Sequence, residues 1–220
     1  MAIEIEKKYR LDKKRLVELT AKLGELDAEF TNEVFEENYL HRGGVLDERN
    51  AVLRLRKTNE KTIFTYKEKV ANESDFKHQI EFETEVSNVD ATEHIIEKLG
   101  YKLAVIYEKH RKTWNLGKVE VVLDELPFGY YMEIEGAIED ILEAEKLLGA
   151  EDLETETRGY PRLTLKFGSK LTEFSNRDST RQRPPRQTSP CRRNAFANQI
   201  RRRRGCPAVY SCRRNSTRGH

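Results

Sequence analysis

Hydrophobic and charged positions alternate along most of the chain, in short segments separated by turn-forming residues. In the first segment, residues 1–10, Ile3 and Ile5 lie on one face and Glu4, Glu6 and Lys8 on the other, because successive side chains of a strand point to opposite sides. Similar extended segments recur at residues 29–41, 51–57, 62–69, 77–86, 102–114, 119–124 and 131–135. The pattern predicts about eight β-strands.

Helical spacing of apolar residues appears between some of these strands. It predicts a helix over residues 13–23, with Asp12 as its N-cap, and another over residues 138–148. A shorter helix is expected to begin at Asp90 or Thr92. Strands with helices inserted between them indicate an α+β fold.

Several predicted strands place two charged side chains on one face. The carboxylates at such positions are Glu4, Glu6, Glu81, Glu83, Asp124, Glu133 and Glu135. The cations are Lys8, Arg54, Arg56, Lys67, Lys69, Lys109 and Arg111. Such faces occur on the wet side of an antiparallel sheet, where charges also protect edges, and in the polar lumen of a closed barrel. A lumen that holds a polyphosphate and its metals explains the repeated doublets, because cations neutralise phosphate oxygens and carboxylates bind Mg²⁺ or Mn²⁺.

The net charge of +2 conceals two blocks of opposite sign. Residues 169–220 hold 14 Lys and Arg against 2 Asp and Glu, whereas residues 1–168 hold 26 against 36, so the net charges are +12 and −10. We therefore expect a folded domain over residues 1–168 and a disordered basic tail over residues 169–220. All three cysteines lie in the tail, which excludes disulfide and thiolate chemistry from the domain.

We expect neither a membrane span nor a signal peptide in this sequence. No apolar run approaches the ~20 residues of a membrane span, and the acidic N-terminus has no apolar segment of the kind found in signal peptides. We expect a cytoplasmic protein with no membrane partner. The arginines of the tail fit the phosphates of nucleic acid, so nucleic-acid binding stays open for the tail alone. A homodimer stays open as well.

The N-terminal pattern Glu4-x-Glu6-x-Lys8, followed in order by the charged doublets above, resembles the signature of the CYTH superfamily, the triphosphate tunnel metalloenzymes. The resemblance covers nearly all of residues 1–168. It implies an eight-stranded antiparallel β-barrel with helices packed outside, a charged tunnel, dependence on Mg²⁺ or Mn²⁺, and a nucleoside or inorganic triphosphate as substrate.

Within this family, segments 99–101, 108–111 and 117–119 are most similar to the class IV adenylyl cyclases. That similarity implies conversion of ATP to cyclic AMP and pyrophosphate. The arginine often found beside the glutamates of the fifth strand is absent, and Gln79 and Ile80 stand there instead. Two alternatives stay open. One is an inorganic or thiamine triphosphatase, and the other is a non-catalytic module that binds a polyphosphate or a nucleotide.

The resemblance also implies roles for the charged residues. The expected metal ligands are Glu4, Glu6, Asp124, Glu133 and Glu135. The expected triphosphate contacts are Lys8, Arg54, Arg56, Lys67, Lys69, Lys109 and Arg111, of which Lys109 and Arg111 are the candidate catalytic residues. Glu81 and Glu83 are either ligands or partners that orient the cations. Tyr160 and Arg162 either close one end of the tunnel or simply pack against it.

Overall fold

The computed structural model describes residues 3–71 and 74–167. The strands are β1 (Ile3–Leu11), β2 (Glu29–Arg42), β3 (Ala51–Lys57), β4 (Thr62–Val70), β5 (Lys77–Glu85), β6 (Lys102–Leu116), β7 (Val119–Leu126) and β8 (Gly129–Glu135). The helices are α1 (Lys13–Glu25), α2 (Val45–Glu48), α3 (Val89–Lys98), α4 (Ile138–Leu147) and α5 (Tyr160–Phe167). The predicted domain boundary at residue 168 and the basic tail lie outside the described residues.

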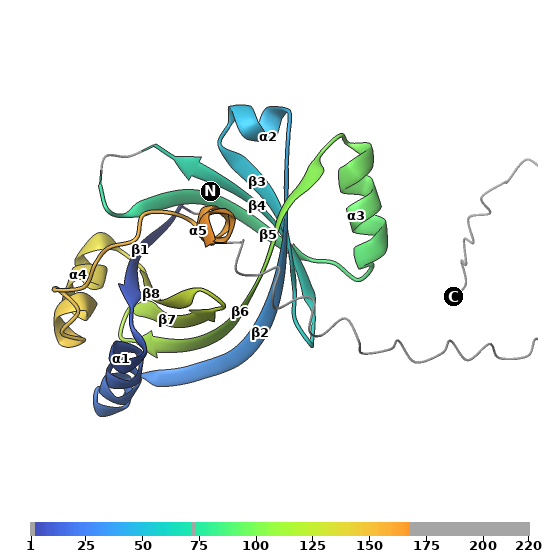
Figure 1. Cartoon of the computed structure of the whole chain (residues 1–220). Helices are drawn as coiled ribbons and strands as arrows, with labels where there is room; N and C mark the ends of the chain where they lie inside the picture. Colours follow the sequence, from blue (N-terminus) through green and yellow to red (C-terminus); the bar gives the residue numbers. More distant parts are fainter. Residues whose placement is uncertain (1–2, 72–73, 168–220) are drawn as a thin grey trace, which may run out of the picture. The chain divides into compact units, whose positions relative to one another are not determined.

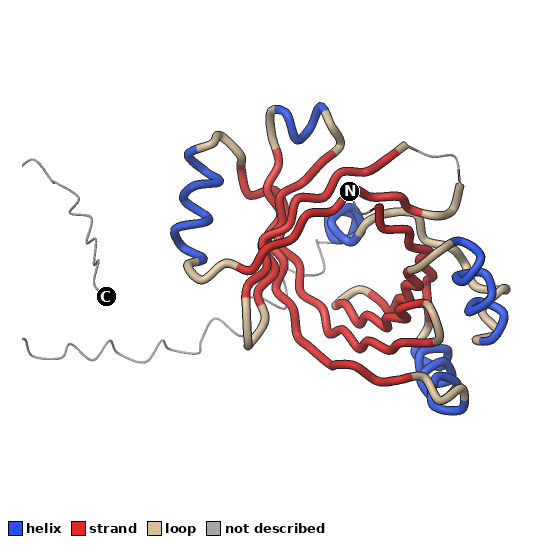
Figure 2. Tube along the Cα trace, turned by 180° about the vertical axis from the view of Figure 1, so that it is seen from behind, coloured by secondary structure: helices blue, strands red, loops and turns tan. Residues whose placement is uncertain are grey.

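The strands form a closed barrel in which every neighbouring pair is antiparallel. The order around the ring is β1-β5-β4-β3-β2-β6-β7-β8, so β1 closes the ring by pairing with both β5 and β8. Figures 1 and 2 show the ring from opposite sides, with α1, α3 and α4 outside it. This arrangement confirms the predicted α+β fold and its eight-stranded antiparallel barrel.

Short polar residues set where two of the helices begin. Asp12 caps α1 as predicted, because its carboxylate accepts a hydrogen bond from the backbone N–H three residues later at 2.7 Å. Helix α3 begins before the expected caps Asp90 and Thr92, because Asn88 already accepts the N–H of Ala91 at 3.0 Å. No helix among the described residues has the length and apolar character of a membrane span.

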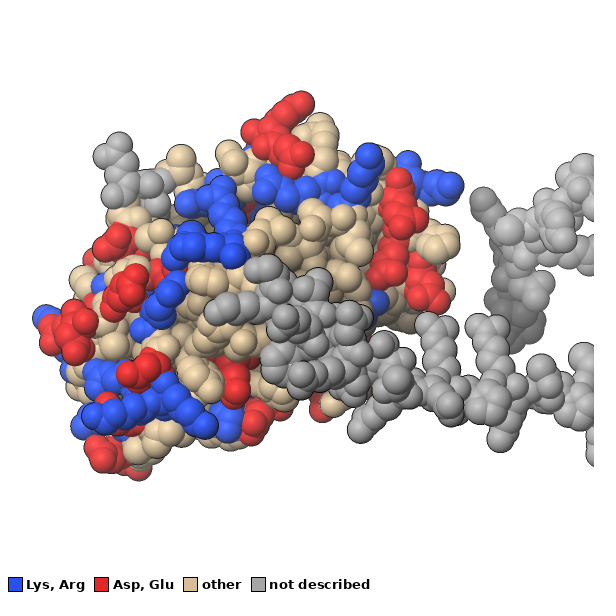
Figure 3. All heavy atoms as spheres, viewed as in Figure 1, with Lys and Arg blue, Asp and Glu red and all other residues tan. Residues whose placement is uncertain are grey.

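The hydrophobic core lies between the outer surface of the barrel and its helices. Outward side chains of β1, β7 and β8, such as Tyr9, Val121 and Ile134, are fully buried in one cluster with Leu23 of α1 and Ile141 of α4. Burial of such surface contributes roughly 25 cal/mol per Å² of apolar area. Because the apolar faces of the strands point outward, their charged faces line the interior. The outer surface seen in Figure 3 carries both signs of charge, spread over the face.

Helix α5 packs against one end of the barrel. Tyr160, its first residue, is buried in a cluster that also contains Leu40 of β2 and Tyr107 of β6. Pro161 lies in the first turn, where a missing N–H removes no helical hydrogen bond. The helix therefore brings a large aromatic side chain to the charged interior.

Candidate active site

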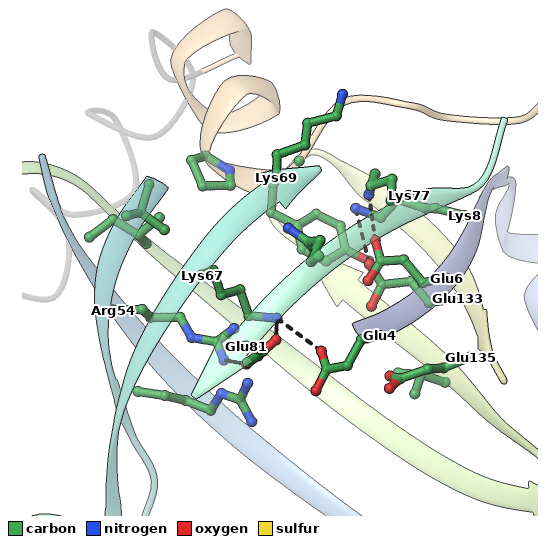
Figure 4. Close-up of a pocket in the computed structure, with 18 of the residues that line it drawn as sticks. Glu4, Glu6, Lys8, Arg54, Lys67, Lys69, Lys77, Glu81, Glu133 and Glu135 are labelled. Carbon is green, nitrogen blue, oxygen red and sulfur yellow. Dashed lines mark hydrogen bonds and ion pairs between the residues drawn. The ribbon is translucent and has the colours of Figure 1, made fainter. Parts of the chain in front are cut away.

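The charged faces of the strands surround a cavity of about 560 Å³. Strand pairing decides which side chains meet there. Glu6 of β1 lies opposite Glu135 of β8 on one side and Lys77 of β5 on the other, and Lys8 lies opposite Glu133. Since paired residues of neighbouring strands share a face, carboxylates and cations from different strands point into one space (Figure 4).

Asp124 of β7 is the centre of one group of ion pairs. Its carboxylate accepts hydrogen bonds from Arg111 Nε at 2.8 Å, Arg111 Nη2 at 2.6 Å and Lys109 Nζ at 3.1 Å. Arg111 Nη2 also donates to Glu133 Oε2 at 2.6 Å, and the other oxygen of Glu133 lies 3.0 Å from Lys8 Nζ. Burial acts to raise the pKa of Glu133, but Lys8 and Arg111 outweigh it and hold that pKa well below its usual range. Glu133 therefore stays ionised in any ordinary assay.

Tyr160 connects α5 to the same group. Its hydroxyl donates a hydrogen bond to Asp124 Oδ2 at 2.8 Å, and its ring centre lies 3.7 Å from Lys8 Nζ and 5.1 Å from Lys109 Nζ. Burial and the charge of Asp124 raise the pKa of Tyr160 well above its usual value, so the hydroxyl keeps its proton. Asp124 is 0% exposed behind these partners and does not line the cavity.

Arg54 of β3 is the centre of a second group. Its Nη2 atom donates to Glu81 Oε1 at 3.1 Å and to Glu83 Oε1 at 3.0 Å. Lys67 forms an ion pair with Glu81 and reaches Glu4 at 3.9 Å. Glu81 and Glu83 of β5 thus hold the cations of β3 and β4 in place.

Lys77 of β5 is a cavity residue that the sequence analysis does not single out. Its Nζ atom donates to Glu6 Oε1 at 2.5 Å, and the residue is only 8% exposed. Figure 4 shows it beside Lys8 and close to Glu6 and Glu133. The sequence did contain a signal for Lys77. The family resemblance leads one to expect an arginine beside the glutamates of this strand, and Gln79 stands there instead. Lys77 is the cation on the same strand face as Gln79.

Uncompensated negative charge lies where β1 begins, β8 ends and β7 begins. Glu135 is directly opposite Glu6 on one side and Glu120 on the other. Burial and the charges of Glu120 and Glu6 raise the pKa of Glu135 to about 7. Within residues 3–71 and 74–167, no lysine or arginine forms an ion pair with Glu135. A divalent cation would offset this excess charge.

The carboxylates of the cavity fit Mg²⁺ or Mn²⁺ in donor type and charge. In the part of the chain that the structure describes, no three potential ligands are already arranged around one point. Two of the carboxylates are instead held by cations, Glu6 by Lys77 and Glu133 by Lys8. A metal would therefore take these carboxylates from the cations that now hold them.

All of the predicted site residues except Asp124 line the cavity. Lys69 is the most peripheral of them, since it is exposed and forms no ion pair with any described residue. Besides Lys77, the predicted set lacks Glu36, Glu120 and Tyr107. Glu36 lies behind the cations of β3 and β6, and the other two line the cavity.

Comparisons with known proteins give a family and a fold. The sequence profile of the CYTH domain matches residues 2–160. No curated protein sequence matches the chain. Among solved structures, the PH1012 protein of Pyrococcus horikoshii OT3 is 24% identical, with a TM-score of 0.64 over 73% of this chain and 98% of that one.

Two other structures are named for activities. A candidate adenylate cyclase from Vibrio parahaemolyticus is 18% identical, with a TM-score of 0.57 over 72% of this chain and 95% of its own. HpAC1 from Hippeastrum, a candidate adenylyl cyclase with a dominant triphosphatase activity, is 16% identical, with a TM-score of 0.56 over 72% and 91%. At such identities the likeness establishes the fold alone.

Proposed function

Because the chain belongs to the CYTH domain family, we propose that it is a metal-dependent enzyme that cleaves a triphosphate bound inside the barrel. The observation that carries this proposal is that many cations line one cavity of about 560 Å³: Lys8, Arg42, Arg54, Arg56, Lys67, Lys69, Lys77, Lys109, Arg111 and Arg162. A triphosphate needs several such donors, because its charged oxygens lose water when they enter a narrow space.

Arg111 and Lys109 are the proposed catalytic residues. Both lie on β6, and Asp124 fixes them by three hydrogen bonds. Donors that are already oriented stabilise the charge that grows on phosphoryl oxygens as the bond breaks. The proposed contacts to the remaining phosphate oxygens are other cations of the cavity lining, Lys8, Arg54, Arg56, Lys67, Lys69 and Lys77.

Glu4, Glu6, Glu133 and Glu135 are the proposed ligands for Mg²⁺ or Mn²⁺. When bound, the metal supplies neutralisation of phosphate charge. Asp124, the fifth expected ligand, is less accessible, because Arg111, Lys109 and Tyr160 already donate to its carboxylate and it does not line the cavity. Glu81 and Glu83 are proposed to orient Arg54, which they already hold.

ATP cyclisation is the first candidate reaction. The ribose 3′-hydroxyl would attack the α-phosphorus, lose its proton and displace pyrophosphate, which yields cyclic AMP. The similarity of segments 99–101, 108–111 and 117–119 to the class IV cyclases favours this reaction.

Triphosphate hydrolysis is the second candidate. Water would attack the terminal phosphorus and release orthophosphate, with no requirement for a nucleobase site. Tyr107 and Tyr160 are the aromatic residues among the described cavity-lining side chains, and Tyr160 is already occupied by Lys8 and Asp124. A lining with so little aromatic surface favours a substrate that needs no base stacking.

Product identification tests the proposal. The full chain is incubated with ATP, thiamine triphosphate or tripolyphosphate, each with Mg²⁺ and with Mn²⁺, and the products are separated by ion-exchange chromatography. Cyclic AMP and pyrophosphate from ATP would support the cyclase. Pyrophosphate and orthophosphate from tripolyphosphate, with ATP untouched, would support the triphosphatase. Binding of these compounds without turnover of any of them would contradict the enzyme and indicate a binding module.

A further inference from the structure

Glu36 is a buried carboxylate for which the proposed reaction has no role so far. It lies on β2, directly opposite Lys109 of β6, and is 2% exposed. Its Oε2 atom lies 3.5 Å from Lys109 Nζ and 3.7 Å from Arg56 Nε, and it accepts a hydrogen bond from Asn38 Nδ2 at 3.3 Å. Since β2 runs between β3 and β6, one oxygen connects the cations of its two neighbouring strands.

The position of Glu36 excludes direct contact with the substrate. Its side chain does not line the cavity, whereas those of Lys109 and Arg56 do. The ion pairs that it forms with described residues are those with Lys109 and Arg56. Glu36 can therefore act on a bound triphosphate only through the cations in front of it.

Electrostatics favours a fixed negative charge at this place. Burial acts to raise the pKa of Glu36, but the charges of Lys109, Arg111 and Arg56 lower it to about 2. Burial and Arg111 lower the pKa of Lys109, and burial and Arg54 lower that of Arg56. The carboxylate thus offsets repulsion between cations that would otherwise push one another apart.

We propose that Glu36 is a positioning residue, which holds Lys109 and Arg56 side by side so that both point at phosphate oxygens. The proposal rests on the proposed function of the cavity. Loss of the charge has two opposite consequences. The cavity lining around Lys109 and Arg56 becomes more positive, so a triphosphate binds at least as tightly as before. Lys109 and Arg56 also gain freedom to take other positions, so turnover falls.

Glu36→Gln in the full chain tests whether affinity and turnover change in opposite directions. Isothermal titration calorimetry with tripolyphosphate in EDTA gives the affinity, and steady-state kinetics with Mg²⁺ gives kcat for whichever substrate the wild type turns over fastest. We expect kcat to fall at least ~10-fold, because small displacements of positioned groups cost rate steeply, while the affinity stays equal or rises. Glu33→Gln, on the same strand but exposed and paired with Lys112 at 3.3 Å, should match the wild type in both measurements.

A smaller fall in kcat would overturn the proposal. So would an affinity that falls together with kcat in a variant whose thermal unfolding matches the wild type. If Glu36→Gln does not fold, Glu36→Asp is measured instead, because it keeps the charge but shortens its reach. Its kcat must also fall at least ~10-fold with affinity kept, and a wild-type kcat contradicts positioning. A wild type that neither binds nor cleaves a triphosphate contradicts the proposed function itself, whereas active Glu36 variants contradict only the positioning role.

Discussion

Replacement of Glu133 by Gln should change substrate binding and turnover in opposite directions. Glu133 lines the cavity and forms ion pairs with Lys8 at 3.0 Å and with Arg111 at 2.6 Å. A triphosphate must compete with this carboxylate for the same two cations. Without the charge of Glu133, both cations are available to phosphate oxygens from the start.

The magnitude follows from Coulomb's law. The charge of the Glu133 carboxylate and that of a neighbouring cation, taken as about 5 Å apart, attract each other by about 3 kcal/mol at an effective dielectric constant near 20. In Glu133→Gln the amide carbonyl would still accept a hydrogen bond from one cation. The free energy of tripolyphosphate binding should therefore become more favourable by about half of this amount. We therefore expect tripolyphosphate to bind about 10-fold more tightly in EDTA. Turnover with Mg²⁺ should fall at least ~100-fold, because a proposed metal ligand is lost.

Calorimetry with tripolyphosphate in EDTA and steady-state kinetics with Mg²⁺ measure the two effects separately. Glu125→Gln is the matched control, since Glu125 is exposed on the outer face of β7 and its replacement changes the net charge by the same amount. Circular dichroism and thermal unfolding establish that each variant is folded. A folded Glu133→Gln protein that binds tripolyphosphate more weakly than the wild type in EDTA would refute the competition between carboxylate and phosphate.

Arg54→Ala should weaken tripolyphosphate binding by about 2 kcal/mol, the scale of a charge-assisted contact, and an unchanged calorimetric affinity would place Arg54 outside the binding site. Glu135, with its pKa raised from 4.5 to about 7, binds its proton more tightly in the native than in the unfolded state. Wild-type stability in EDTA should therefore fall as pH rises from about 4.5 to about 7. Urea unfolding of Glu135→Gln should lack this part of the pH dependence, and identical profiles would exclude the shift. Tyr160→Phe removes the hydroxyl that donates to Asp124 but keeps the ring, so urea unfolding should show a loss of about 1–2 kcal/mol; no loss would mean that the hydrogen bond adds nothing. A chain that ends at Gly168 should keep activity and unfold cooperatively at the midpoint of the full chain, and loss of cooperativity would give the tail a structural role.

The strand faces were predictable because a half-buried strand shows its period of two in the sequence itself. Ile3 and Ile5 differ from Glu4 and Glu6 in polarity, so the alternation of odd and even positions alone separates the interior face from the exterior one. Closure of the strands into a barrel did not follow from this alternation, since an open sheet with one face in water has the same pattern. The family resemblance supplied that step, and the observed order of strands confirms it.

The residues that sequence analysis missed depend on strand register between distant segments. Lys77 meets Glu6 because β5 pairs with β1, across a separation of 71 residues. Glu36 is followed by a second glutamate, so the alternation is ambiguous in β2, and only its pairing with Lys109 places it inside. The burial of Asp124 depends on Tyr160, in a segment whose type was not predicted.

Cations and carboxylates inside the barrel neutralise one another, as Lys77 does with Glu6 and Arg111 with Glu133. A triphosphate alone would leave these carboxylates without counter-charges, and a divalent cation alone would leave the lysine and arginine without theirs. An unpaired buried charge costs about 3–5 kcal/mol, so either event alone is opposed. Bound together, each ligand takes the partners that the other releases. Metal and triphosphate should therefore strengthen each other's binding by the same factor, and this factor should shrink in Glu133→Gln, which has already lost one of the competing carboxylates.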